Sequence, residues 1–214
     1  MRSRTAPSSP RDLCAGRWTP VANWSRGDRG AMPVIRSDTH GDLFAQITSL
    51  NLERQQLLLR DSIAVALRIP FRIDEHLVLA LHAACATFLV ERPGRYRTEP
   101  VFVSYSDRLF PDPEHVPTLV RELIVDVYRR WHEDDPFTLA AYALWRLNWI
   151  HPFDDANGRT ARAVAVYIVS VKFGRWMPGR IDALQIIKGN HDRYVAALQH
   201  ADRGMAPRRI SWSR

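Results

Sequence analysis

The chain has 214 residues, an apolar fraction of 46% and a formal net charge of +7. Its length fits one domain, and its composition is that of a soluble protein that can build a hydrophobic core. The excess charge lies at the two ends, because residues 1–36 hold seven arginines against two acids and residues 203–214 hold four arginines and no acid. The middle of the chain has a net charge of −2, which argues against a basic nucleic-acid-binding face across the whole domain.

The cysteine content and the hydropathy of the chain favour a cytoplasmic protein. Cys14 and Cys85 do not have the spacing of a metal site, and so few cysteines suit a reducing compartment. The longest largely apolar segment, residues 77–90, is too short to cross a bilayer. The N-terminal sequence lacks the apolar region of an ordinary secretory signal, so we expect no membrane span.

The organisation predicted from composition is one folded domain between two basic tails. Residues 1–36 contain four prolines and no helical or strand periodicity, which predicts a disordered or loosely docked tail. Residues 37–202 form the expected domain, and residues 203–214 form a basic C-terminal tail. Such tails are most often solvated, although they can bind nucleic acid or an anionic membrane.

In chain order, apolar residues at helical spacing predict a first helix over 38–67. Asp74 is expected to cap a second helix, whose apolar face includes Phe88 and which the Pro-Gly pair at 93–94 ends. The segment 101–105 is β-branched and aromatic. It gives the one convincing strand signal and is typical of a hairpin arm.

Further helices are predicted over about 113–131, 137–150 and 157–174, and one or two short helices over 181–201. Strands and helices do not alternate, which argues against a Rossmann-type sheet. The pattern therefore predicts an all-α fold with one β-hairpin.

A polar segment joins the last two long helices, with the sequence His151-Pro-Phe-Asp-Asp-Ala-Asn-Gly-Arg-Thr-Ala-Arg162. The first N–H groups of a helix lack intrahelical partners and attract anions, and the missing Cβ of Gly158 lets a phosphate approach the backbone. Arg159 and Arg162 are three residues apart, at neighbouring positions of the first turn. Two guanidinium groups beside a helix N-terminus suit a polyphosphate.

Other side chains of this segment indicate metal-assisted chemistry on that phosphate. A divalent cation at a phosphate is usually held by one or two carboxylates, and Asp155 is the expected ligand, ahead of Asp154. Histidine has an unperturbed pKa near neutrality, so His151 can accept a proton from a hydroxyl group that attacks the phosphate. Phe153 is expected to anchor the loop in the core, and His82 to be a satisfied core histidine.

The polar segment resembles the signature of the Fic family, H-x-F-x-[D/E]-[A/G]-N-G-R-x-x-R, and fills every specified position. The resemblance extends over about residues 45–200. It includes Pro93-Gly-Arg-Tyr-Arg97 and Val101-Phe-Val103, which are similar to the family's target-docking flap. It implies a Fic-like helical bundle in which Val101, Phe102 and Val103 belong to a β-hairpin flap.

Fic domains mostly transfer AMP from ATP to a hydroxyl group of a protein, and the resemblance implies this reaction here. His151 would be the base for a Ser, Thr or Tyr hydroxyl of a target protein, and Asp155 would hold Mg²⁺. The implied nucleotide-binding residues are Asn157 and Gly158 at the α-phosphate, Arg159 and Arg162 at the β- and γ-phosphates, and Asn190 and Tyr194 near the adenine. A helix cap and a core tyrosine explain Asn190 and Tyr194 equally well. The related Doc branch, a phosphotransferase, carries lysine at the position of Gly158, so this chain favours nucleotide transfer.

The resemblance also suggests a built-in inhibitor. Fic domains are commonly inhibited by a helix with the pattern [S/T]-x-x-x-E-[G/N], whose glutamate pairs with the last arginine of the signature. Ser49-Leu-Asn-Leu-Glu53 fits this pattern within an expected helix 42–67, but Arg54 occupies the G/N position. An ordinary surface glutamate explains the match equally well, and a separate antitoxin-like chain could then supply the inhibitory glutamate.

Two other functions stay open at this point. The same site could remove AMP from a target by hydrolysis, with Glu53 helping to position the water. Alternatively, the chain could be a non-catalytic module whose basic tails bind nucleic acid or a protein. The sequence does not define the target protein, the choice of ATP over another nucleotide, or whether the chain forms a homo-oligomer.

Overall fold

The computed structural model describes residues 34–69, 73–102, 109–177 and 189–204. The chain divides into two compact units, Met1–Ala31 and Met32–Arg214, and the described residues all belong to the second. The tails expected at 1–36 and 203–214 fall largely outside the description. At the start of the described part, the Ile35 N–H donates to the Phe88 carbonyl over 2.7 Å.

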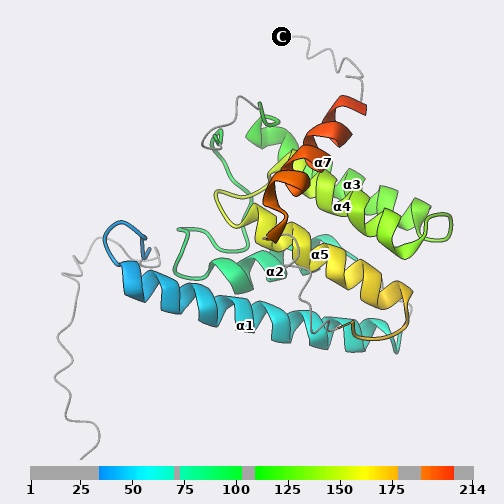
Figure 1. Cartoon of the computed structure of the whole chain (residues 1–214), viewed down its shortest axis with the longest axis horizontal. Helices are drawn as coiled ribbons and strands as arrows, with labels where there is room; N and C mark the ends of the chain where they lie inside the picture. The colour runs from blue at the N-terminus through cyan, green and yellow to red at the C-terminus, as the bar shows by residue number, and fades with distance from the viewer. Residues whose placement is uncertain (1–33, 70–72, 103–108, 178–188, 205–214) are drawn as a thin grey trace, which may run out of the picture. The chain divides into compact units, whose positions relative to one another are not determined.

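The described part of the chain is helical (Figure 1). The helices are α1 (Gly41–Ala66), α2 (Glu75–Ala86), the 3-10 helix η2 (Pro113–His115), α3 (Val116–Arg130), α4 (Pro136–Ile150), α5 (Asn157–Lys172) and α7 (His191–Gly204). The all-α class predicted from the sequence is confirmed. Val101 and Phe102 are not in a strand, and the rest of the expected hairpin, including Val103, lies outside the described residues. None of the described helices is both long and apolar enough to cross a membrane.

Two helices begin at aspartate caps. Asp74, as predicted, accepts the Leu77 N–H over 2.7 Å at the start of α2. Asp135 accepts the N–H groups of Phe137 and Thr138 over 2.9 and 3.1 Å at the start of α4. These carboxylates satisfy N–H groups that have no partner within the helix.

α2 ends at Ala86, well before the Pro-Gly pair that was expected to end it. Its C-cap Thr87 has φ −54° and ψ 129°, and Phe88 has φ 64°. The prediction that Phe88 continues the helical face is therefore wrong. The buried Asn51 of α1 donates from Nδ2 to the Thr87 carbonyl over 2.6 Å. This carbonyl therefore accepts a bond from α1 in place of the backbone hydrogen bond that it would accept if α2 continued.

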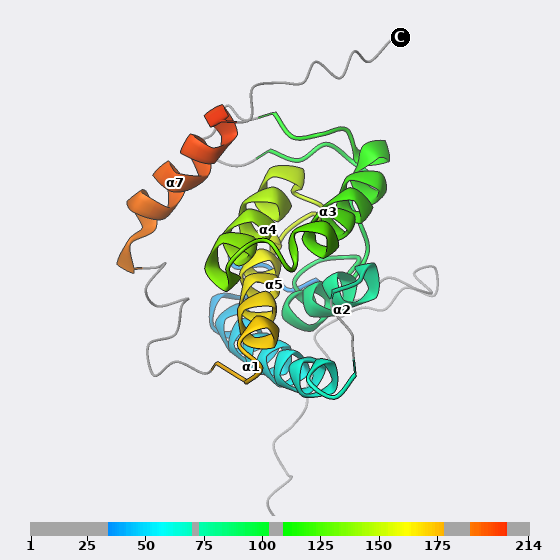
Figure 2. The ribbon, with the colours of Figure 1, turned by 90° about the vertical axis from the view of Figure 1, so that its right-hand side faces the viewer.

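α5 lies between α4 and the pair formed by α1 and α2 (Figure 2). Its side chains Tyr167 and Ile168 are fully buried in the main core. Burying a side chain of this size stabilises the fold by roughly 1.5–3 kcal/mol. This packing fixes the N-terminus of α5, which receives the polar segment from α4.

α7 is joined to α4 by polar side chains. Trp145 donates from Nε1 to Asp202 Oδ1 over 2.8 Å, and Asn148 donates from Nδ2 to the Tyr194 hydroxyl over 3.3 Å. Both contacts come from the half of α4 that leads into the polar segment. They bring Tyr194 to the end of α4 that bears His151.

Candidate active site

Residues 151–156 join α4 to α5, and the backbone at both ends of this loop is left-handed. His151, the C-cap of α4, has φ 51° and ψ 61°, and Ala156, the N-cap of α5, has φ 60° and ψ 14°. This conformation costs a residue with a Cβ roughly 1–2 kcal/mol. Neither residue is glycine, so contacts with the surrounding structure must hold the loop in this shape.

Phe153 and Asn157 fix the middle of the loop. Phe153 is fully buried, as predicted. Asn157 accepts the Phe153 N–H at Oδ1 over 2.9 Å and donates from Nδ2 to the Phe153 carbonyl over 2.8 Å. The Asn157 amide is therefore used within the loop, and the group that it can offer to an anion is its backbone N–H in the first turn of α5.

His82 supports the loop from α2. Its ring stacks on Phe153, with centroids 3.7 Å apart and planes 2° apart. Nδ1 accepts the Gly94 N–H over 2.9 Å, and Nε2 donates to the Asp155 carbonyl over 3.2 Å. Burial lowers the pKa of His82 from 6.5 to about 4, while the bond to Asp155 acts in the opposite direction. The prediction of a satisfied core histidine is confirmed, and its partner is the polar loop itself.

The His151 side chain is half-buried at the surface of this loop. Its Nδ1 lies 3.4 Å from the Asn148 carbonyl oxygen, and its ring lies 4.4 Å from the Phe110 ring at 38°. A neutral imidazole that donates from Nδ1 carries its basic lone pair on Nε2. This geometry suits a base that acts through Nε2.

Arg97 connects the His151 backbone to the segment that precedes α3. It is charged but only 2% exposed. Nε donates to the His151 carbonyl over 2.8 Å, Nη1 to the Glu99 carbonyl over 3.1 Å, and Nη2 to the Pro111 carbonyl. Its backbone N–H donates to the Pro152 carbonyl over 3.0 Å. Burial lowers the pKa of the Arg97 guanidinium, and nearby carboxylates oppose this shift.

The two arginines at the start of α5 have different partners. Arg159 donates from Nη1 to the Cys85 carbonyl at the end of α2 over 3.1 Å, and its Nη2 lies 3.4 Å from Asp155 Oδ2. The Arg162 guanidinium lies beside the Tyr194 hydroxyl of α7. Its Nε is buried and has no hydrogen-bond partner in the described part of the chain. The neighbouring arginines predicted from spacing thus contact different helices.

Gly158 leaves room for the Arg162 side chain. A Cβ placed at Gly158 would lie 3.1 Å from Arg162 Nη1, which is closer than ordinary contact. An alanine here would require the Arg162 guanidinium to shift by a few tenths of an ångström. The missing Cβ also allows the close approach of a phosphate that the sequence predicts.

The two residues expected near an adenine belong to the start of α7 and the turn before it. Burial raises the pKa of Tyr194, and the contact with Arg162 opposes this shift. Asn190 is exposed, and its carbonyl accepts the Tyr194 N–H over 2.9 Å. Tyr194 therefore joins the polar loop through Arg162, while Asn190 precedes it at the surface.

Asp155 is the more exposed of the two loop carboxylates. Its side chain is 64% exposed, against 35% for Asp154, whose Oδ2 lies 3.4 Å from Arg92 Nη2. A Mg²⁺ ion at a nucleotide takes one or two protein carboxylates and completes its shell with phosphate oxygens and water. One exposed carboxylate beside a helix N-terminus fits this chemistry, so Asp155 is the residue that could hold the ion.

The residues of the expected inhibitory motif lie on an exposed side of α1. Ser49 and Glu53 are exposed, whereas the buried residues of α1 include Asn51 and Gln55. Among the described residues no ion pair joins Glu53 to Arg162, whose guanidinium contacts Tyr194 instead. The predicted pair is not formed in this structure.

The expected docking residues border a shallow hollow next to His151. Val101 and Phe102 line the hollow together with Leu109 and Phe110, and Phe102 is 86% exposed. Phe110 also contacts the His151 ring, so the hollow and the imidazole share a wall. Val103 lies outside the described residues.

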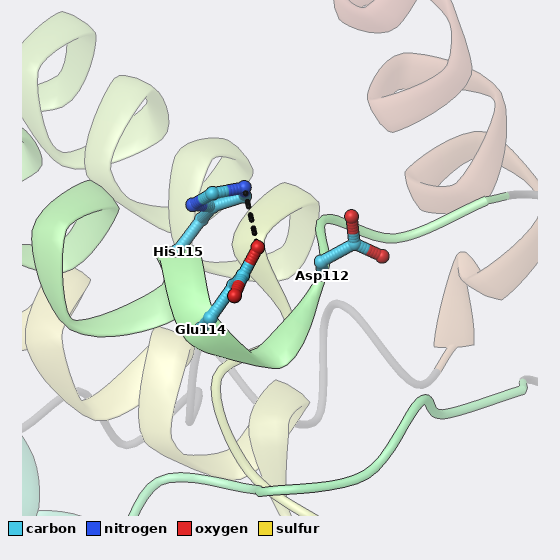
Figure 3. A group of neighbouring side chains, drawn as sticks. All are labelled: Asp112, Glu114 and His115. Carbon is cyan, nitrogen blue, oxygen red and sulfur yellow. Dashed lines mark ion pairs between the residues drawn. The ribbon is translucent and has the colours of Figure 1, made fainter. Parts of the chain in front are cut away.

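A second polar group precedes α3 and contains Asp112, Glu114 and His115 (Figure 3). Their potential ligand atoms lie within 4.8 Å of one another, and His115 Nε2 is 3.4 Å from Glu114 Oε1. The His115 N–H donates to the Asp112 carbonyl over 3.0 Å, which forms the turn of η2. The turn and the ion pair account for this grouping, and Asp112 and Glu114 are exposed.

Comparisons with known proteins place this site in a family. The family model described as the Fic/DOC family matches residues 72–169. A Fido domain-containing protein from Dictyostelium discoideum is 32% identical over 117 residues, which are 54% of this chain and 76% of that protein. A Nematostella vectensis protein named protein adenylyltransferase Fic is 40% identical over 75 residues, which are 32% of this chain and 16% of that protein.

The fold is also similar to that of a solved structure, residues 134–508 of Fic-1 from C. elegans. The TM-score is 0.56 at 24% sequence identity, and the match covers 73% of this chain and 44% of that chain. At this identity the likeness shows the fold alone. The chain spans less than half of the Fic-1 structure and a sixth of the Nematostella protein, so it shares only part of each.

Proposed function

Because this chain belongs to the Fic/DOC family, we propose that it is a protein adenylyltransferase that transfers AMP from ATP to a hydroxyl side chain of a target protein. The observation that carries this proposal is the loop between α4 and α5. It places an imidazole, an exposed carboxylate and the N-terminus of α5 with its two arginines within one short segment. The named adenylyltransferase among the relatives supports the same reaction.

In the proposed reaction His151 acts as the base. Nε2 accepts the proton of a Ser, Thr or Tyr hydroxyl while the hydroxyl oxygen attacks the α-phosphorus of ATP. The new P–O bond forms as the bond from the α-phosphorus to the oxygen bridging to the β-phosphate breaks, and pyrophosphate leaves. The bond from Nδ1 toward the Asn148 carbonyl favours the tautomer that leaves Nε2 basic.

The first turn of α5 binds the nucleotide in this proposal. Its N–H groups and the positive end of the helix dipole face the α-phosphate, and Gly158 lets the phosphate approach. Arg159 and Arg162 bind the outer phosphates, and Tyr194 and Asn190 lie on the adenine side. Mg²⁺ held by Asp155 would supply positive charge to the phosphate oxygens when it is bound.

Transfer of radiolabel tests this proposal directly. ATP labelled at the α-phosphate should label a protein of a cell lysate, whereas ATP labelled at the γ-phosphate should not. His151→Ala should abolish labelling without weakening ATP binding, because His151 takes part in proton transfer only. Label transferred from the γ-phosphate would indicate a phosphotransferase, and no label from either nucleotide would contradict the proposal.

Inhibition by Glu53 stays a prediction, because Glu53 and Arg162 do not pair in this structure. If Glu53 competes with the γ-phosphate for Arg162, Glu53→Gln should raise the transfer rate and tighten ATP binding. Asp61→Asn, at another exposed acid of α1, is the matched control and should change neither quantity. Equal rates for all three proteins would leave inhibition to a separate chain, and loss of activity in Glu53→Gln would instead favour the hydrolytic alternative.

A further inference from the structure

Arg97 is a buried charge whose side-chain donors all reach backbone carbonyls. A guanidinium taken out of water is costly unless its donors are satisfied. Here Nε, Nη1 and Nη2 each have a carbonyl acceptor, on His151, Glu99 and Pro111. No described carboxylate forms an ion pair with Arg97. The charge is therefore balanced by these carbonyl dipoles together with the longer-range attraction of Asp112 and Asp154.

The acceptors of Arg97 lie on two parts of the chain that are far apart in sequence. His151 and Pro152, bonded by Nε and by the backbone N–H, begin the loop between α4 and α5. Glu99 and Pro111 lie on either side of residues 103–108 in the segment expected to dock the target. One side chain therefore fixes the base loop and both ends of that segment relative to each other.

This arrangement also controls the ring of His151. Phe110 precedes Pro111, whose carbonyl Arg97 holds, and the Phe110 ring lies 4.4 Å from the His151 ring. The left-handed backbone of His151 is intrinsically unfavourable by roughly 1–2 kcal/mol. The bond from Arg97 Nε to the His151 carbonyl opposes its relaxation, so Arg97 acts on both the backbone and the ring packing of one residue.

We propose that Arg97 is a positioning residue for AMP transfer, which orients the His151 imidazole toward the hydroxyl of the docked target. This inference rests on the proposed function, because it assumes that His151 is the base. Arg97 does not touch the reacting groups. Its contribution is to hold Nε2 in line with a hydroxyl group presented from the docking segment.

Arg97→Lys separates this role from the need for a charge. Lysine keeps the positive charge, but its single ammonium cannot span three carbonyls as the planar guanidinium does. We expect Arg97→Lys to bind ATP within about threefold of wild type, because α5 is untouched, while kcat for transfer falls about 100-fold, the loss that a displacement of roughly 1 Å can cause. Arg129→Lys, at an exposed arginine of α3 that takes no part in the site, is the matched control and should behave like wild type.

A spectroscopic measurement tests the positioning without relying on activity. The Phe110 ring, 4.4 Å from the His151 ring, should shift the His151 ring-proton signals, which can be assigned by comparison with His151→Gln. Arg97→Lys should move the His151 signals toward those of an exposed histidine, and Arg129→Lys should not. If the wild-type protein transfers no AMP, the proposed function fails, whereas this comparison still decides whether Arg97 positions His151.

Transfer by Arg97→Lys within twofold of wild type would overturn the inference, and so would His151 signals that do not move. A parallel loss of ATP binding and transfer would also overturn it, because it would show a general structural role. Should Arg97→Lys not fold, the wild-type protein supplies the test. Its Arg97 Nε–H should exchange with solvent far more slowly than those of exposed arginines, and equal exchange rates would contradict the bond to the His151 carbonyl.

Discussion

The stability of this protein should depend on the protonation of His82. Histidine in the unfolded chain has a pKa near 6.5, whereas burial keeps the pKa of His82 in the folded protein at about 4. Between these values the unfolded state binds more protons than the folded state. The free energy of unfolding therefore has its full His82 contribution above pH 6.5 and loses it as the pH falls toward about 4.

The size of this effect follows from the two pKa values. Their difference corresponds to about 3 kcal/mol at 1.36 kcal/mol per unit, of which about 2 kcal/mol is lost by about pH 5. This is a large part of the roughly 5–15 kcal/mol that stabilises a typical domain. The structural event is the loss of an acceptor, because a protonated Nδ1 can no longer accept the Gly94 N–H.

Urea unfolding followed by circular dichroism at about pH 5 and pH 7.5 measures this loss. Glutamine does not titrate, and its amide can both donate and accept a hydrogen bond. From pH 7.5 to about pH 5, the free energy of unfolding should therefore decrease by about 2 kcal/mol less in His82→Gln than in wild type. His76→Gln, at an exposed histidine of the same helix, should follow wild type. Equal decreases in wild type and His82→Gln would refute the assignment of a low pKa to His82.

Substitutions at three further positions test the loop and the fold. Asn157→Ala leaves the N–H and carbonyl of Phe153 without their partners, at roughly 1–3 kcal/mol each. Urea unfolding should therefore show a loss of about 2–6 kcal/mol. Asn157→Asp should lose less, and equal losses would contradict the two-bond assignment. Gly158→Ala should not lower the thermal midpoint, because alanine favours a helix. It displaces Arg162, however, and calorimetry should show ATP binding weakened about tenfold, as the loss of one charged hydrogen bond does. An unchanged affinity would contradict the role of Arg162. Asp135→Ala should lower the thermal midpoint through loss of the α4 cap, and an unchanged thermal midpoint would argue against that cap.

The helices could be predicted from the sequence because their signals are local. Asp74 caps α2 through a bond that spans three residues, and Gly174, with φ 68°, follows the end of α5 as expected of a C′ glycine. The end of α2 could not be predicted, because Asn51 lies 36 residues from the Thr87 carbonyl that it binds. A sequence pattern over one or two helical turns cannot indicate a contact between residues so far apart.

Sequence patterns indicate the residues of the candidate site, which are local, but not the distant residues that support them. The polar loop is contiguous, so its side chains could be found from sequence alone. Arg97 and His82 lie 54 and 73 residues from the loop groups that they bind. The burial of His82 could be predicted in part, because this histidine lies within the apolar segment 77–90. The burial of Arg97 could not be predicted locally, because an arginine in an irregular segment is normally exposed.

The two arginines of α5 show why spacing identifies a binding site without defining its contacts. A separation of three residues fixes where the side chains start, but each guanidinium then takes the acceptor within its reach. Arg162 lies beside the neutral Tyr194 hydroxyl, whereas Arg159 bonds the neutral Cys85 carbonyl and pairs with the charged Asp155. Two opposite full charges attract each other more strongly than a charge attracts a neutral hydroxyl, so a phosphate should displace Tyr194 from Arg162 more readily than Asp155 from Arg159. We therefore expect Arg162 to change partners when a nucleotide binds, and Arg159 to keep its place beside the carboxylate.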